Sequence, residues 1–538
     1  MELARATSRP SPSVTPASTK ATRRPPETTS AVHVSTPPGR TAARKLTFIS
    51  ALAENTFRPL AQVTVAAPMA ESQNAAMNPP WRTPAGFVNL SSAAISQTVR
   101  PGSDFSTQTI PRVRSQLGGT CIGWSAIGSE RYPTPPRPGA LPSPALPGYR
   151  RGMASPATTL LRAATVLTPD GPLSPGEVTV EDGVIVAVGP PRPGTAPDLD
   201  PDRVLVPGFL DLQVNGIGTV DVATADGDDW DRLDEALLAQ GVTTWCPTLT
   251  STSDPALAAA LDRVTAAARR TADRPRPTLA GAHLEGPFLA VAGAHPPEHL
   301  RPVLDPAWPA GLPAVVRLVT LAPELPGALD AVRFLTDRGI LVALGHSACT
   351  YEEARVAAAA GARLVTHLGN AMAPFHHRRP GLLGAALTDP LLTCSLIADL
   401  VHVHPALLHL AFAAKGPAGC LLVTDAVAAA AGRVGPVTLD PATTVVGPGG
   451  LPPRLADGTL AGSVLTVDRA LTNLVGAGIT LADAVTAVTA TPARLLGLHD
   501  RGAIAPGRRA DLVELETTPT GLVVRQVWVA GRPAGWSR

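Results

Sequence analysis

The stretch from about residue 206 to residue 490 alternates short apolar segments with alanine-rich segments, and few folds accommodate this alternation. Eight of the apolar segments have the length and composition of buried strands. The segments between them, such as TYEEARVAAAAGA, place Ala, Glu and Arg at helical spacing. Eight strand–helix units in this length predict a (β/α)8 barrel. The predicted strands are GFLDLQV, TTWCPTL, LAGAHLEG, RLVTLAPE, LVALGHS, RLVTHLGN, CSLIAD and CLLVTDA.

Short segments with strand-like alternation flank this region on both sides. On the N-terminal side, GEVTVEDGVIVAVG contains Asp182-Gly183 between two strands, which is a hairpin signal. On the C-terminal side, ADLVELETTPTGLVVRQVWVAGRPA shows the same pattern. We therefore predict one small β domain built from residues 153–205 and 506–538, with the barrel at 206–505 between them.

Residues 1–152 differ from the rest of the chain in composition. They are rich in Pro, Ser and Thr, as in RPSPSVTPASTKATRRPPETTS, and have no sustained period, so we predict a largely disordered extension. Their 17 Lys and Arg against 6 Asp and Glu give +11, whereas the remainder carries −9. The basic residues are scattered singly without an aromatic platform, so we expect no nucleic-acid partner. Two alternatives stay open: a long transit peptide, or a natural start at Met153, just before the strand pattern begins.

The overall composition is that of a well-packed protein with a large core. Charged residues make up 16% and hydrophobic residues 44% of the chain, and no apolar run approaches the ~18 residues of a membrane helix, so we expect no membrane partner. The cysteines are odd in number and form no C-x-x-C pair, which favours free thiols in a reducing, cytoplasmic setting. They are Cys121, Cys246, Cys349, Cys394 and Cys420.

Polar side chains stand at the C-terminal ends of the predicted barrel strands, where the active sites of this fold lie. Two imidazoles and one carboxylate, from His346, His367 and Glu285, form the ligand set of a catalytic Zn²⁺ site with one position left for water. Asp425, at the end of the last strand, can act as the general base. The pattern predicts metal-assisted hydrolysis of an amide or a related bond. The strand-ending polar residues are Gln213, Glu285, His346, His367, Asp399 and Asp425.

Twelve sequence motifs, taken together and in order, are specific enough to indicate a family. They are, in order, PGFLDLQVNG, HLEGPFL, GAHPPEHLRP, TLAPE, GHSACTYEEA, THLGNAM, RRPGLLGAAL, IADLVHVHP, LVTDA, LAGSVLTVDRAL, TPARLLGL and GAIAPGRRADLV. From about residue 158 to 535 the sequence closely resembles N-acetylglucosamine-6-phosphate deacetylases of the amidohydrolase superfamily. The resemblance implies a (β/α)8 barrel with a small β-sandwich domain. It covers none of residues 1–152.

The resemblance also implies the reaction. The expected substrate is N-acetyl-D-glucosamine 6-phosphate, hydrolysed to D-glucosamine 6-phosphate and acetate in amino-sugar recycling. A related substrate such as N-acetylgalactosamine 6-phosphate is the alternative, because the sequence does not separate epimers. A third hypothesis, an inactive paralogue that binds a sugar phosphate, conflicts with the intact ligands and base.

The family's site residues match particular positions of this sequence. The metal ligands match Glu285, His346 and His367, and the catalytic aspartate matches Asp425. His295, in GAHPP, matches the histidine that binds the substrate and polarises its carbonyl group.

The resemblance further implies a phosphate site shared between two subunits. The phosphate-binding pair matches His402 and Arg378, and in the family that arginine reaches in from the neighbouring subunit, so a homodimer is implied. Asn370 and Ala371 match a stretch that also contacts the sugar phosphate. A forked arginine donor suits a dianionic phosphate.

Gln213 and Asn215, in GFLDLQVNG, stand where many metal-dependent amidohydrolases carry His-x-His. Neutral amides supply no imidazole for a second metal ion, so we expect one divalent ion per subunit. We expect both amides to orient the water and the sugar phosphate instead. Nitrogen and oxygen ligands suit Zn²⁺, with Fe²⁺, Co²⁺ and Mn²⁺ as alternatives.

Three features depart from the family pattern. Gly369 stands where the family usually has Phe or Tyr, which is expected to loosen the sugar pocket. Leu400 stands where the family usually has Gly, beside His402. The loop FLAVAGAHPP is shorter than usual, which is expected to affect the position of His295.

Overall fold

The computed structural model describes most of the chain after the N-terminal extension. The described ranges are 158–192, 199–271, 273–431, 436–439, 442–447 and 451–536, with the backbone alone described for 436–447. The predicted disordered extension at 1–152 and the alternative start at Met153 lie outside these ranges.

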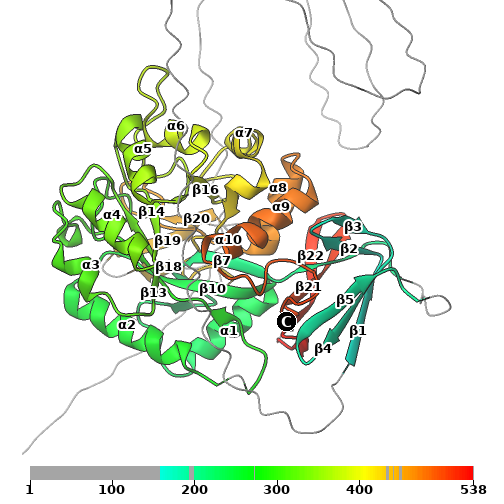
Figure 1. The fold of residues 1–538 in the computed structure, drawn as a ribbon. Coiled ribbons are helices and arrows are strands. Elements are labelled where there is room, and N and C mark those ends of the chain that lie inside the picture. The colour runs from blue at the N-terminus through cyan, green and yellow to red at the C-terminus, as the bar shows by residue number, and fades with distance from the viewer. Residues whose placement is uncertain are drawn as a thin grey trace, which may run out of the picture. The chain divides into compact units, whose positions relative to one another are not determined.

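The eight predicted barrel strands all form, and they pair in parallel in sequence order (Figure 1). A bridge between Val214 and Ala426 brings the first strand next to the segment after the last one. The Asn215 amide donates to the Ala426 carbonyl at 2.8 Å, and the Asp425 amide donates to the Gln213 carbonyl at 2.9 Å. The predicted (β/α)8 barrel is confirmed. Its strands are β7 (Phe209–Val214), β10 (Val242–Leu249), β12 (Ala282–Glu285), β13 (Val316–Leu321), β14 (Leu341–Leu344), β15 (Leu364–Val365), β16 (Thr393–Leu396) and β17 (Cys420–Leu422).

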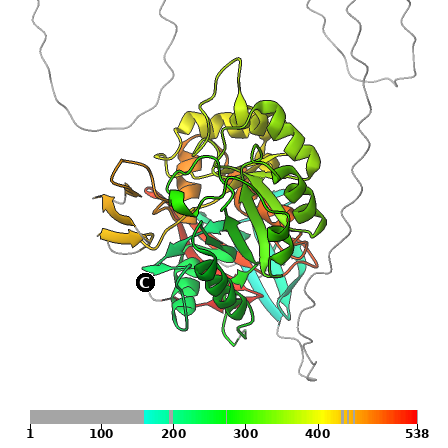
Figure 2. The same cartoon turned by 90° about the vertical axis from the view of Figure 1, so that its left-hand side faces the viewer.

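Helices follow the barrel strands and surround them (Figures 1 and 2). The predicted alanine-rich helix forms as α5 (Tyr351–Ala360). Its start is fixed by a capping box between Thr350 and Glu353, and it ends at Gly361, whose φ of 129° few other residues adopt. The other helices are α1 (Asp229–Ala239), α2 (Asp254–Ala268), α3 (Ala307–Gly311), α4 (Ala328–Asp337), α6 (Gly381–Thr388), α7 (Pro405–Lys415), α8 (Val467–Gly476), α9 (Leu481–Val488), α10 (Ala490–Leu495) and the 3-10 turns η1 (Pro297–His299) and η2 (Pro417–Gly419).

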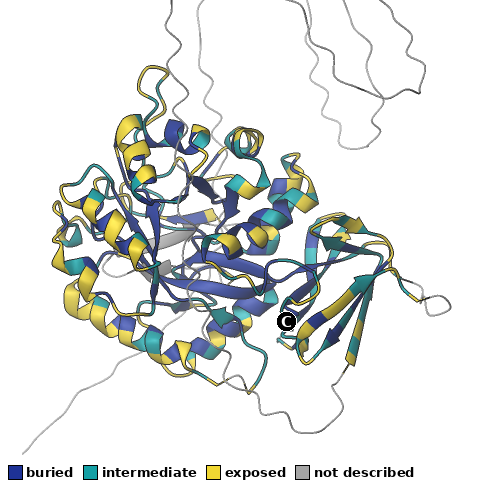
Figure 3. Cartoon of the chain, viewed as in Figure 1, coloured by how far each residue is buried: buried dark blue, intermediate teal, exposed yellow. Residues whose placement is uncertain are grey.

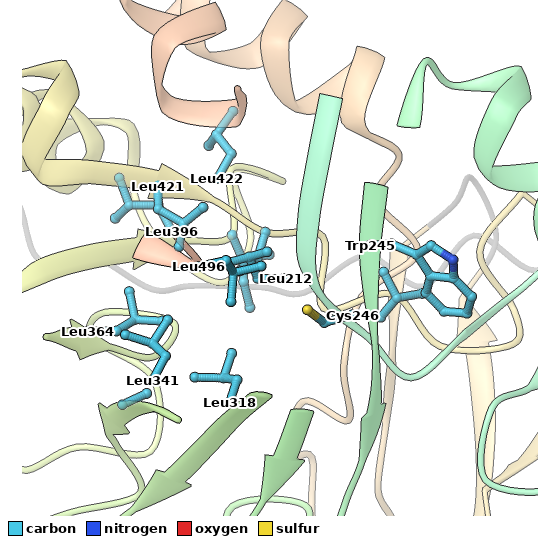
Figure 4. Close-up of a cluster of buried hydrophobic side chains, with 14 of the residues drawn as sticks. Leu212, Trp245, Cys246, Leu318, Leu341, Leu364, Leu396, Leu421, Leu422 and Leu496 are labelled. Atoms are coloured by element: carbon cyan, nitrogen blue, oxygen red, sulfur yellow. The ribbon is translucent and has the colours of Figure 1, made fainter. Parts of the chain in front are cut away.

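The main core lies between the barrel strands and these helices. The strands are buried along their length, whereas the helices expose their outer faces (Figure 3). Leucines from many strands meet there, and they include Leu212, Leu318, Leu341 and Leu364 (Figure 4).

A small β-sandwich joins the two ends of the described chain. The turn predicted at Asp182-Gly183 forms, with positive φ at both residues, between two of its antiparallel strands. A second apolar core, which includes Val178 and Leu512, fills the sandwich. One sheet holds β1 (Thr158–Ala163), β4 (Gly176–Glu181) and β5 (Val184–Gly189), and the other holds β23 (Arg532–Ala534), β22 (Gly521–Val529), β21 (Leu512–Thr518), β6 (Arg203–Pro207), β2 (Thr165–Thr168) and β3 (Gly171–Leu173).

Further short strands were not expected from the sequence. An antiparallel sheet follows the last barrel strand and precedes α8. The sequence between 431 and 461 is rich in Gly and Pro, which masks strand patterning. These strands are β8 (Gly216–Ile217), β9 (Val220–Asp221), β11 (Thr278–Leu279), β18 (Pro436–Leu439), β19 (Ala442–Gly447) and β20 (Leu451–Arg454).

Two sequence-based expectations bear on the described part of the chain. Cys246, Cys349, Cys394 and Cys420 are buried and free, as predicted. Among the described residues, no helix combines the length and the apolar character that a membrane span requires.

Replacing a leucine in the barrel core tests this packing. Leu212→Ala removes a side chain that is 0% exposed, so we expect the free energy of unfolding to fall by about 2–5 kcal/mol. Leu160→Ala is the matched control, since Leu160 is 41% exposed on β1, and its effect should stay within about 0.5 kcal/mol. Guanidinium chloride unfolding measures both, and equal effects would contradict the assignment of the core.

Candidate active site

Four predicted site residues converge where the barrel strands end. Glu285 is the last residue of β12, and His346, His367 and Asp425 each follow a strand within three residues. The three that follow strands have positive φ values of 49°, 25° and 51°. Such backbone costs roughly 1–3 kcal/mol per residue and clusters at functional sites. The chain thus places strained backbone where the sequence predicted chemistry.

Neighbouring polar groups hold this backbone in place. Ser395 Oγ accepts from the His367 amide at 2.7 Å. Glu324 accepts from Ser347 Oγ and from the Ala348 amide, both at 2.7 Å, and so fixes the turn after His346. Sequence patterning did not identify Ser395 or Glu324, although Glu324 belongs to the quoted TLAPE motif.

Three donor atoms from the predicted metal ligands lie close together. Glu285 Oε1 is 3.0 Å from His367 Nε2 and 3.4 Å from His346 Nε2, and the two Nε2 atoms are 3.1 Å apart. Lone pairs at these distances repel unless a proton or a metal ion lies between them. Ligand atoms of a tetrahedral metal ion, each about 2.0–2.2 Å from it, lie roughly 3.3–3.6 Å apart. The donor set therefore fits a single divalent ion.

The charges of this cluster point the same way. Burial opposes ionisation of Glu285, but the adjacent imidazoles of His295, His346 and His367 lower its pKa well below the usual range. Burial disfavours the protonated form of His367, but the hydrogen bond and charge of Glu285 raise its pKa. Both shifts show that positive charge is favoured beside the Glu285 carboxylate.

A hydrogen bond at Nδ1 fixes the orientation of the His346 ring. Its Nδ1 is 2.9 Å from the Val291 carbonyl oxygen, which can only accept a hydrogen bond. Nδ1 therefore carries the proton, and Nε2 presents its lone pair to Glu285 and His367. A hydrogen bond of this kind commonly fixes a metal-ligating histidine.

His295 lies beside these residues and offers an alternative third ligand. Ligand atoms of Glu285, His295 and His346 all lie within 4.8 Å of one another. However, the Ser251 backbone amide donates to His295 Nδ1 at 3.2 Å, so the neutral His295 ring carries its hydrogen on Nε2, the nitrogen that faces Glu285, and has no lone pair there for a metal ion. We therefore favour His367 as the third ligand. Despite the short loop before it, His295 lies within the site.

Gln213 connects the two carboxylates of the site. Its Nε2 donates to Glu285 Oε1 at 3.0 Å and to Asp425 Oδ1 at 3.1 Å, and its Oε1 accepts from Thr366 Oγ1 at 3.0 Å. Asn215 Nδ2 donates to the same Asp425 oxygen at 2.7 Å. The amide of Gln213 thus lies between the two carboxylates and donates to both.

The pKa values of the two carboxylates are pushed apart. Burial, together with the negative charge of Glu285, raises the pKa of Asp425 to about 6. The pKa of Glu285 is lowered instead. Carboxylates with separated pKa values divide the roles of ionised ligand and proton-transfer group. The raised pKa of Asp425 suits a proton-transfer group.

A cavity of about 970 Å³ opens above these residues. Asn215, His295, Asn370, Ala371 and His402 line it together with the metal-ligand candidates and Asp425. Gln213 is not among the residues that line it, and its side-chain hydrogen bonds go to Glu285, Asp425 and Thr366. A role of Gln213 in orienting the water and the sugar phosphate stays a prediction. Arg263 and Arg454 also line the cavity, although the sequence motifs gave no reason to select them.

His402 is held by a carboxylate that also follows a strand. Asp399 Oδ2 is 2.7 Å from His402 Nδ1, so the ring presents Nε2 to other partners. Burial would raise the pKa of Asp399, but the hydrogen bond from His402 lowers it. Leu400, between them, has a φ of 65°, a conformation that favours glycine, which matches the glycine usual in the family.

At Gly369, where the family usually has an aromatic ring, a neighbouring leucine lies close to the backbone. A Cβ on Gly369 would lie 3.1 Å from Leu407 Cδ2, so a neighbouring side chain already fills the direction a ring would take. The expected loosening of the pocket at this point is therefore limited. Arg378 is exposed and is not among the residues that line the cavity of its own chain.

The fold and the site together define a barrel hydrolase of the metal-dependent class. The amidohydrolase family model matches residues 204–534, and the chain belongs to this family. It is 39% identical over 387 residues to N-acetylgalactosamine-6-phosphate deacetylase from Escherichia coli O157:H7, covering 70% of this chain and all of the relative. It is 37% identical over 350 residues to N-acetylglucosamine-6-phosphate deacetylase from Danio rerio, covering 62% of this chain and 84% of that relative.

Solved structures with the same description share this fold. N-acetylglucosamine-6-phosphate deacetylase from Thermotoga maritima matches with a TM-score of 0.64 and 32% identity over 70% of this chain and 100% of its own. A mutant of the Mycobacterium smegmatis deacetylase in complex with N-acetyl-D-glucosamine 6-phosphate matches with a TM-score of 0.64 and 34% identity. The match covers 70% of this chain and 99% of the mutant's chain.

Asp211, in β7, supports the turn at Asp425 and titrates unusually. It accepts from Thr424 Oγ1 at 2.5 Å and from the Thr424 amide at 3.2 Å, and burial raises its pKa to about 7. Between about pH 4 and pH 7 the folded chain thus holds a proton that the unfolded chain has lost, so Asp211 makes stability fall as pH rises. Asp211→Asn is neutral throughout and removes this contribution.

We therefore expect wild-type protein to lose thermal stability relative to Asp211→Asn as the pH rises from 4 to 7. Melting temperatures of both proteins across this range measure the difference. Asp337→Asn, an exposed position at the end of α4, is the control and should leave the pH dependence unchanged. A constant difference between wild type and Asp211→Asn would refute the shifted pKa.

Proposed function

We propose that this protein hydrolyses the acetamide group of N-acetyl-D-glucosamine 6-phosphate, giving D-glucosamine 6-phosphate and acetate. The observation that carries the proposal is the donor cluster of Glu285, His346 and His367 with Asp425 beside it, in a chain similar over most of its length to deacetylases of N-acetylhexosamine 6-phosphates. N-acetylgalactosamine 6-phosphate is the second candidate, because the relative with 39% identity is named for it.

Glu285, His346 and His367 would hold one divalent ion in each subunit. When bound, such an ion supplies Lewis acidity that activates water and polarises a carbonyl group. The mixed nitrogen and oxygen donors favour zinc, and Fe²⁺, Co²⁺ and Mn²⁺ suit the same donors. Gln213 supports a stoichiometry of one, since its amide nitrogen already bridges Glu285 and Asp425.

Asp425 and His295 would carry the proton transfers and stabilise the developing charge. Asp425 takes a proton from the attacking water and later gives it to the leaving amine. Asn215 holds the Asp425 carboxylate during both steps through its 2.7 Å hydrogen bond. His295 donates its Nε2–H to the carbonyl oxygen, where negative charge develops.

The phosphate would lie at the part of the cavity lined by Asn370, Ala371 and His402. Arg378 would complete this site from a neighbouring subunit, because its own chain leaves it exposed and away from the cavity wall. This arrangement requires a homodimer. A sugar phosphate as substrate and buried free thiols both suit a cytoplasmic enzyme.

A panel of acetylated sugars tests the substrate. We expect acetate release from N-acetyl-D-glucosamine 6-phosphate to exceed that from the unphosphorylated sugar by at least about 100-fold in kcat/KM, because a bound dianion contributes several kcal/mol. N-acetylgalactosamine 6-phosphate is assayed in parallel. Higher kcat/KM for the galacto epimer would favour the second candidate, and no release from either phosphate would contradict the proposal.

Asp425→Asn tests the proton-transfer role. The amide keeps the shape of the carboxylate but cannot accept the proton, so we expect kcat to fall by roughly 1,000-fold or more. Metal content should stay at the wild-type value, because Asp425 is not among the three proposed ligands. Acetate release and elemental analysis measure the two effects. Turnover near the wild-type rate would show that another group is the base.

A further inference from the structure

Ser251 is a buried polar residue for which the reaction above has no use. It lies two residues after β10, lines the cavity and is 5% exposed. Its Oγ is 3.0 Å from His295 Nδ1, and its backbone amide donates to the same nitrogen at 3.2 Å. Both polar groups of Ser251 are therefore directed at one ring atom.

These contacts determine where His295 carries its proton. A backbone amide can only donate, so His295 Nδ1 must accept. The neutral ring then bears its hydrogen on Nε2, which faces the site and lies 3.7 Å from Glu285 Oε2. The other neutral tautomer would bring the proton on Nδ1 against the amide proton of Ser251, which is repulsive.

The neighbouring His346 has the opposite arrangement. Its Nδ1 faces a carbonyl oxygen, so its Nε2 carries a lone pair, although the two ring centroids are only 4.6 Å apart. A backbone carbonyl at one ring and a backbone amide at the other therefore give the two adjacent imidazoles opposite tautomers. His346 can bind a cation, and His295 can donate a hydrogen bond.

The local fold makes room for the Ser251 hydroxyl. A Cβ on Gly286 would lie 2.3 Å from Ser251 Oγ, so a side chain at this position would force the hydroxyl to move from its place beside His295. Gly286 also has a φ of 92°, a conformation that glycine adopts freely. The glycine after Glu285 therefore allows the hydroxyl to approach His295.

We propose that Ser251 is a positioning residue that holds His295 in the tautomer and orientation whose Nε2–H stabilises the carbonyl oxygen of the substrate during hydrolysis. This inference rests on the proposed deacetylase function. Ser251 acts through His295, since within the described part of the chain its amide and its hydroxyl both contact His295 Nδ1 and neither bonds to a proposed metal ligand or to Asp425.

Ser251→Ala removes the hydroxyl and keeps the backbone amide. We expect kcat to fall roughly 10-fold, as when a partner that orients a site histidine is lost, while KM changes less than about twofold. Metal content should be unchanged. Ser251→Thr keeps the hydroxyl and should recover most of the rate. The matched control is Ser253→Ala, an exposed serine of the same loop whose side chain makes no cap hydrogen bond.

A double-mutant cycle separates positioning from a structural role. If Ser251 acts through His295, Ser251→Ala should have no further effect on kcat in a His295→Asn background. A 10-fold loss that persists in that background would overturn the inference, as would a Ser251→Ala rate equal to that of Ser253→Ala.

Nitrogen-15 NMR of histidine-labelled protein gives a readout that does not depend on the substrate. The His295 resonances, assigned by their loss in His295→Asn, should show a protonated Nε2 and an unprotonated Nδ1. A protonated Nδ1 in the wild-type protein would overturn the inference whatever the substrate is. Failure of the wild-type protein to release acetate would instead count against the proposed function.

Discussion

The close approach of three donor atoms at the mouth of the barrel is the constraint on which the site depends. Glu285 Oε1 and the Nε2 atoms of His346 and His367 lie 3.0–3.4 Å from one another, and this arrangement is stable only with positive charge among them. The surrounding hydrogen bonds serve this cluster. A carbonyl oxygen points the His346 lone pair inward, and the Gln213 amide keeps the second carboxylate at a fixed distance.

The cluster is held by strained backbone that the barrel can support. His346, His367 and Asp425 all adopt positive φ just beyond short parallel strands. A rigid, fully buried sheet beneath them offsets this cost, and side-chain acceptors such as Ser395 Oγ hold the turns. The barrel closes at the same place, through the hydrogen bond from the Asp425 amide to the Gln213 carbonyl. The same hydrogen bond therefore both closes the barrel and positions the backbone of Asp425, the proposed base.

Much of this could be predicted from the sequence. Period and composition identified all eight barrel strands, because strands buried on both faces read as continuous apolar runs. Polar residues closing those runs identified Glu285, His346, His367 and Asp425. The resemblance to known deacetylases added His295, Asn370, Ala371 and His402, which all line the same cavity. The predicted domain boundaries stay predictions, although strands from both flanking segments share one sheet.

What the sequence could not provide was the set of contacts between residues distant along the chain. Ser251 and Asp211 act through hydrogen bonds that span 44 and 213 residues, and nothing in their local patterns reveals the partner. The position of Gln213 between two carboxylates also depends on the three-dimensional register of several strands, which its local sequence does not reveal. The sheet at 436–454 was missed because Gly and Pro hide its alternation.

The central claim is that one metal ion per subunit is bound by Glu285, His346 and His367, with His295 outside the ligand set. Elemental analysis of metal-saturated, dialysed protein tests it most directly. We expect one ion per subunit in wild type and in His295→Ala, and almost none in His367→Ala. Two tightly bound ions in wild type, or loss of the ion in His295→Ala but not in His367→Ala, would contradict it.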